Sequence, residues 1–136
     1  MILSQATASA ATSAITGNFG ANATLVIYSG TAPAGPDTAL SGNTALVTGT
    51  VSSWGAPAYN STNGGMTSTG TMSAASYAPA ASGTASFARI LNSGGTALSQ
   101  LTVGTSGTDV ILGTTTISTG TNVAMSVSVN VPSQSV

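Results

Sequence analysis

Short runs of large apolar residues recur along most of this chain at about ten-residue spacing, separated by turns rich in glycine, proline and asparagine. Runs of this length are typical of β-strands rather than of helices. The pattern predicts seven or eight short strands, within residues 25–28, 45–51, 66–77, 82–91, 97–103, 110–112, 114–118 and 123–131. Such spacing favours an all-β domain with one two-layer core, a β-sandwich or jelly roll.

The last of these runs has the clearest pattern in the sequence. Its apolar residues alternate strictly with small or polar ones, and they are Val123, Met125, Val127, Val129 and Val131. Successive side chains of a strand point to opposite faces, so this alternation predicts that all five face the core. Pro132 ends the run, because proline has no N–H to donate to a neighbouring strand.

Residues 1–20 contain the one segment that favours a helix. Ser4 is a suitable N-cap, residues 5–16 form the body, and Gly17 with Asn18 is a suitable end. Helical spacing predicts a narrow apolar stripe made of Ala8, Ala11, Ile15 and Phe19. An extended arm that reaches a neighbouring subunit is the alternative. Residues 21–136 are then expected to form the β-sandwich, with one structural domain overall.

Charge is nearly absent from the chain. Arg89 is its one basic residue, Asp37 and Asp109 are its acidic residues, and it contains neither His nor Cys. Without imidazole, thiol or lysine it lacks the usual nucleophile relays and the ligands of a cysteine zinc site. One guanidinium cannot neutralise a phosphate backbone, and no apolar run is long enough for a membrane span. We therefore expect no enzyme activity, no cofactor, no metal, and no nucleic-acid or membrane partner.

The three charged residues have structural interpretations. Asp37 and Asp109 lie in predicted turns, where a carboxylate commonly accepts backbone N–H groups. Arg89 lies in a predicted strand, where it is an exposed residue, a contact to another subunit, or a buried and paired cation. We predict an ion pair between Arg89 and Asp109, because each needs a partner if it is buried.

Three aromatic residues, Trp54, Tyr59 and Tyr77, flank a loop rich in asparagine and glycine. Tyrosine and tryptophan are enriched at protein interfaces and in pockets that face sugars. The same residues equally close the end of a small core. They are candidate interface anchors, with a core lid as the alternative.

The exposed surface has to be built largely from Ala, Thr, Ser and Gly, which fill about three in five positions. Most soluble domains carry charges on a quarter or more of their surface, and these keep molecules apart. A neutral surface allows close contact between copies and is not affected by salt. It suits a subunit packed in quantity into an assembly.

Three segments of the chain are distinctive when taken together: LVIYSGTAP at 25–33, GTA with FARI at 83–85 and 87–90, and VGTSGTDVIL with ISTG at 103–112 and 117–120. They resemble a family of small structural proteins of tailed bacteriophages. Their order and spacing extend the resemblance from about Ala6 to Pro132. The resemblance implies a virion protein with a helix followed by strands.

The same resemblance implies a function in the phage particle. A capsid decoration (cement) protein on the outside of the head is the expected role. Its partners are then other copies of itself, with a trimer preferred, and the major capsid protein. A tail or fibre adhesin domain that recognises a host glycan or receptor is the alternative.

Overall fold

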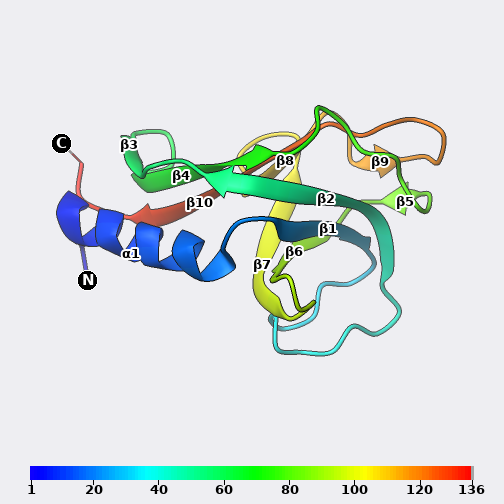
Figure 1. The fold of residues 1–136 in the computed structure, drawn as a ribbon, viewed down its shortest axis with the longest axis horizontal. Helices are drawn as coiled ribbons and strands as arrows, with labels where there is room; N and C mark the ends of the chain where they lie inside the picture. Colours follow the sequence, from blue (N-terminus) through cyan, green and yellow to red (C-terminus); the bar gives the residue numbers. More distant parts are fainter. Residues whose placement is uncertain (136) are drawn as a thin grey trace.

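The computed structural model describes residues 1–135 and is built mainly of strands, with one helix against one end of the sheet (Figure 1). The helix, α1, spans Gln5–Phe19. The strands are β1 Ala23–Ser29, β2 Thr44–Trp54, β3 Ala58–Asn60, β4 Gly65–Met72, β5 Gly83–Thr84, β6 Phe87–Leu91, β7 Ala97–Gly104, β8 Val110–Leu112, β9 Thr116–Ile117 and β10 Met125–Pro132. The prediction of an all-β fold with a short N-terminal helix is confirmed.

Seven strands close into a barrel rather than two packed sheets, so the predicted sandwich or jelly roll is wrong. The order around the barrel is β10-β8-β7-β6-β1-β2-β4, and β4 then pairs with β10. Neighbours are antiparallel except β7 and β8, which are parallel. Residues that alternate in and out look the same in a barrel and in a sandwich, so the sequence pattern does not distinguish the two.

Strand β4 closes the barrel because it pairs along both of its edges. Its second half pairs with the end of β2, where Trp54 lies opposite Gly70. Its first half pairs with β10, from Gly65 opposite Pro132 to Thr69 opposite Ser128. The short β3 continues the β2 edge and also pairs with β4. One strand therefore joins the two ends of the sheet.

The interior of the barrel is narrow and filled by aliphatic side chains. Its most deeply buried members come from five of the strands and are Leu25, Ile27, Val47, Val51, Ile90, Val110 and Val127. Gly70 shows how tight this packing is. A Cβ atom at Gly70 would lie 2.8 Å from a methyl carbon of both Val51 and Val127. Interiors packed this closely tolerate little added volume.

Strand β10 confirms the predicted alternation over most of its length. Val123, just before it, and Met125 and Val127 within it are buried in the core. Val129 is partly buried against the same core, and Val131 is half-buried near the end of the strand. The polar residues between them remain on the outside or are partly covered.

The helix begins where the sequence predicts and ends later. Ser4 caps it by accepting a hydrogen bond from the Thr7 N–H at 3.2 Å. It continues to Phe19 and ends at Gly20, whose φ of +75° favours glycine. The helical form of residues 5–19 replaces the alternative of an extended arm.

The buried face of the helix is rotated from the predicted stripe. It consists of Ala8, Thr12, Thr16 and Phe19, whereas Ile15 is exposed. Two threonines can be buried because their hydroxyls find acceptors on the preceding turn. Thr12 Oγ1 donates to the Ala8 carbonyl at 2.8 Å and also reaches the Met66 carbonyl of β4 at 3.2 Å. The helix thus packs on β4 and β10, over the closing seam of the barrel.

Replacing Val127 by aspartate is expected to unfold the domain. The Val127 side chain is 1% exposed, and an unpaired carboxylate there costs several kcal/mol. Ser126→Asp is the matched control, because Ser126 is the adjacent residue of β10 and is exposed. Circular dichroism and thermal unfolding distinguish the two variants. A folded Val127→Asp variant with an unchanged melting temperature would contradict the inward orientation of β10.

Candidate functional site

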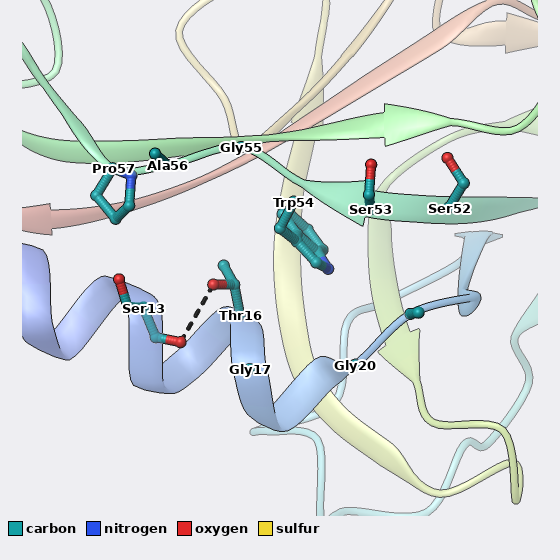
Figure 2. Close-up of a pocket in the computed structure, with 11 residues that line it drawn as sticks. Ser13, Thr16, Gly17, Gly20, Ser52, Ser53, Trp54, Gly55, Ala56 and Pro57 are labelled. Atoms are coloured by element: carbon teal, nitrogen blue, oxygen red, sulfur yellow. Dashed lines mark hydrogen bonds between the residues drawn. The ribbon is translucent and has the colours of Figure 1, made fainter.

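A shallow groove of about 470 Å³ lies between the last turns of α1 and the end of β2 (Figure 2). The helix contributes Ser13, Thr16 and Gly17, and Gly20 follows at the helix end. This spacing of three and four residues places them on one face of the helix. The opposite wall is the segment 52–57, and the Trp54 side chain extends from this segment toward the helix.

Trp54 is held in this groove from two sides. Strand β2 ends at Trp54, and the next residue, Gly55, donates its N–H to the Thr69 carbonyl of β4 at 2.9 Å. The indole packs against the Phe19 ring of α1, with centroids 5.6 Å apart and planes tilted by 52°. The ring is partly exposed, but its Nε1 is buried and has no hydrogen-bond acceptor within residues 1–135.

The groove is neutral and rich in hydroxyl groups. Thr16 Oγ1 donates to the Thr12 carbonyl at 3.1 Å, and Ser52 Oγ donates to the Thr71 carbonyl at 2.9 Å. Ser13 and Ser53 are exposed, and their hydroxyls bond no other described residue. None of the residues that line the groove is ionisable. The site therefore offers an aromatic ring and hydroxyls, without a charge or a nucleophile relay.

Tyr77 lies in a structural position at the barrel rather than in the groove. Its backbone bridges Val123, and its ring packs against the main core next to Gly49. Its hydroxyl bonds Ser73 Oγ at 2.9 Å, accepts from the Ala74 N–H and donates to the Thr50 carbonyl. Burial raises the pKa of this hydroxyl, but its hydrogen bonds with Ser73, Ala74 and Thr50 together outweigh that effect and leave the pKa lowered. These contacts match the core-lid interpretation of Tyr77.

Tyr59 is half-buried in β3, where it lies opposite Met66 of β4. Trp54 and Tyr59 thus follow one another along the same edge of β4, whereas Tyr77 packs over β2. The three predicted anchors do not form one cluster. The structure brings Trp54 and Phe19 together instead.

Arg89 is buried on the outer face of the barrel, at 5% exposure. Its Nη2 donates to the carbonyls of Gly35 at 3.0 Å and Thr38 at 2.7 Å, and Nε and Nη2 both reach Gln100 Oε1. Gln100 in turn donates to the Pro33 carbonyl at 2.7 Å. The one cation of the chain thus fastens the loop of residues 30–43 to β6 and β7.

The loop covers a second, smaller apolar cluster on the outside of the barrel. Val26, Tyr28 and Phe87 form it, and the rings of Tyr28 and Phe87 stack with centroids 5.1 Å apart. Burial raises the pKa of the Tyr28 hydroxyl, and the nearby Arg89 charge offsets part of that rise. Arg89 is therefore part of a covered outer layer and not an exposed strand residue.

The predicted ion pair between Arg89 and Asp109 is wrong. Asp109 Oδ2 accepts hydrogen bonds from the N–H and the hydroxyl of Thr102, each at 3.0 Å. The Thr102 hydroxyl oxygen also accepts a hydrogen bond from the Asp109 N–H. Arg89 and Asp109 each form hydrogen bonds with neutral groups, and they do not bond to each other. The turn-capping role expected of Asp109 is the one that the structure shows.

Neither the groove nor the contacts of Arg89 could be predicted from the sequence, because both depend on groups that form no side-chain motif. The groove is made from small residues, such as Gly17 and Gly20, that carry no recognisable motif. The acceptors for Arg89 are mostly backbone carbonyls, which every residue has. The one available signal was Gln100, a polar side chain within a predicted strand.

Other kinds of site are not found in the described part of the chain. No three His, Cys, Asp or Glu side chains gather there to hold a metal ion. No helix within residues 1–135 is long and apolar enough to cross a membrane. Comparison of the chain with protein-family models, with curated proteins and with solved structures found no match.

Replacing Arg89 by methionine is expected to release the loop of residues 30–43. The change keeps a long side chain but removes every donor to Gly35, Thr38 and Gln100. Bonds from a charged donor contribute about 1.5–3 kcal/mol each. The carbonyls of Gly35 and Thr38 regain water once the loop opens, so the free energy of unfolding should fall by the value of one or two such bonds, roughly 2–5 kcal/mol. Hydrogen exchange should rise first in the loop. Asp109→Asn is the control, and equal loosening of the loop by that variant would contradict this assignment.

Proposed function

We propose that this chain is a structural virion protein of a tailed bacteriophage, which decorates the outside of the capsid as a homo-oligomer. The three segments that resemble phage structural proteins support this role. They correspond to β1 with its following turn, to β5 and β6, and to the region from β7 to β9. These segments contain most of β1 and β6, all of β8 and the last two residues of β7, and they include Arg89.

The observation that carries the proposal is the nearly uncharged exterior. Of the three charged side chains, Arg89 is buried, Asp109 is partly buried on Thr102, and Asp37 is exposed. Copies of such a molecule do not repel one another when they are packed densely on a shell. Affinity then comes from apolar contact and hydrogen bonds, since electrostatic complementarity needs charges that the surface lacks.

The closed barrel also suits a subunit that contacts its copies through particular side chains and not through open strand edges. An open sheet edge invites pairing with further chains, and the pairing of β4 with β10 leaves only the three-residue β3 as the end strand of the main sheet. Contacts between copies are then made by side chains, with Trp54 and Tyr59 as the partly exposed aromatic anchors. Homo-oligomers usually close by rotational symmetry, and a trimer is the form that the phage resemblance favours.

A tail or fibre adhesin domain is the second candidate. The observation that favours it is the groove beside Trp54, with an aromatic ring among hydroxyl groups. Copy number separates the two functions, because a decoration protein is present in hundreds of copies per particle and an adhesin in a few.

The copy number is measured in purified particles of a phage whose genome encodes this chain. Quantitative mass spectrometry gives its molar ratio to the major capsid protein, and antibody labelling in electron microscopy gives its position. A ratio near that of a shell component, with label over the head, supports decoration. A few copies at the tail support the adhesin, and absence from the particles overturns both.

Decoration by uncharged contacts predicts how the protein leaves the particle. Washing particles in molar sodium chloride should leave it bound, because salt screens only charged interactions. Guanidinium chloride should release it at concentrations that leave the shell intact, since guanidinium solvates apolar and peptide groups. Potassium chloride at the same ionic strength as the guanidinium wash is the control. Complete release by simple salt would contradict the proposed contact chemistry.

A further inference from the structure

We propose that the groove between α1 and the end of β2 binds a neutral saccharide, with one sugar ring against Trp54. This inference concerns the groove itself and does not depend on where in a particle the chain resides. It follows from three features of the site: the indole, the hydroxyl-rich and uncharged walls, and the open helical side.

The Trp54 ring supplies the apolar platform. It is partly exposed in the groove and is braced by the Phe19 ring, so its position is fixed before a ligand arrives. An aromatic ring is electron-rich on its face, and the C–H groups on one side of a pyranose are weakly positive. A rigid ring therefore binds a sugar face at low entropic cost.

The N–H group of the Trp54 indole is buried at the edge of this platform. Trp54 Nε1 has no acceptor within residues 1–135, and an unsatisfied buried donor is unfavourable. In Figure 2 the nitrogen lies on the side of the ring toward Gly20, where the chain leaves the helix. This donor is buried beside the groove and not open to it, so the face of the ring, and not the N–H, is the surface offered to a sugar.

The walls select a neutral, hydroxylated ligand. Ser13 presents a free hydroxyl from the helical side of the groove, and this hydroxyl can donate and accept. Sugar hydroxyls have the same two capacities. A charged ligand would find no counter-ion, because no ionisable residue lines the groove. The chemistry therefore fits glucose- or galactose-type sugars better than uronic or sialic acids.

The helical wall leaves room for a ring. A Cβ atom at Gly17 would meet nothing within 4 Å, and the same holds at Gly20. Gly17 lies within α1 and not in the positive-φ region, so other residues can adopt its conformation. A larger side chain at position 17 is thus expected to fill the groove without disturbing the barrel.

The test uses the full chain and its own fluorescence. Trp54 is the single tryptophan of the sequence, so its emission reports directly on the groove. Neutral oligosaccharides of glucose, galactose and N-acetylglucosamine are titrated, with oligogalacturonate as the charged comparison. We expect a saturable shift in emission with at least one neutral sugar, with an affinity on the order of millimolar and unchanged by salt.

Five variants separate ligand binding from structural effects. Gly17→Leu should weaken binding at least about tenfold by filling the groove. Gly17→Ala keeps the groove open, and Ala14→Leu adds the same side chain at an exposed helical position outside it, so both should bind normally. Trp54→Leu should lose binding in ligand-observed nuclear magnetic resonance, whereas Tyr59→Leu should retain it.

Other results overturn the proposal. Absence of any shift with all neutral sugars at tens of millimolar excludes a saccharide site of this affinity. Equal binding by Gly17→Leu places the sugar elsewhere on the molecule. An emission that depends on protein concentration, with Gly17→Leu changing the oligomeric state, identifies a second copy of the chain as the occupant of the groove. The copy number in particles tests the virion role separately.

Discussion

The pairing of β4 along both of its edges is the constraint on which the rest of the molecule depends. It turns a twisted sheet into a closed barrel, and it fixes the width of the interior that the core side chains have to fill. Gly70 lies where β4 meets β2, and its missing side chain admits Val51 and Val127. The same pairing places Trp54 beside the helix, because β2 ends where β4 changes partner.

Closure also explains how a chain so poor in large apolar residues keeps a dry core. A narrow barrel needs few side chains to fill it, and its outer face can be covered where needed by a loop. The loop of residues 30–43 does this for Tyr28 and Phe87, held by the Arg89 guanidinium. The Arg89 guanidinium therefore holds the loop to the barrel and adds no charge to the exterior, which stays nearly neutral.

The sequence predicted local features well and distant ones poorly. Alternation identified the inward residues Val123, Met125 and Val127, and the Ser4 cap located the helix start, because both signals are local. Barrel closure depends on how residues 65–69 meet residues 128–132, which no local pattern encodes. The Arg89 prediction failed because scarcity of charge suggested a carboxylate partner, whereas backbone carbonyls were available. Trp54 was singled out as a candidate anchor and lines the groove, whereas its helical neighbours were not singled out.

The position of α1 over the seam has a consequence for the order of folding. The helix contains the earliest residues of the described chain, yet it packs on β10, which contains some of the latest, and Leu3 bonds Gln134. The start of α1 and the end of β10 accordingly lie on the same side of the molecule in Figure 1. During synthesis the helix has no completed surface to dock on until β10 has emerged. Contacts this distant in sequence form slowly, so α1 is synthesised before all the strands of the barrel and docks on the seam only after β10 has been made.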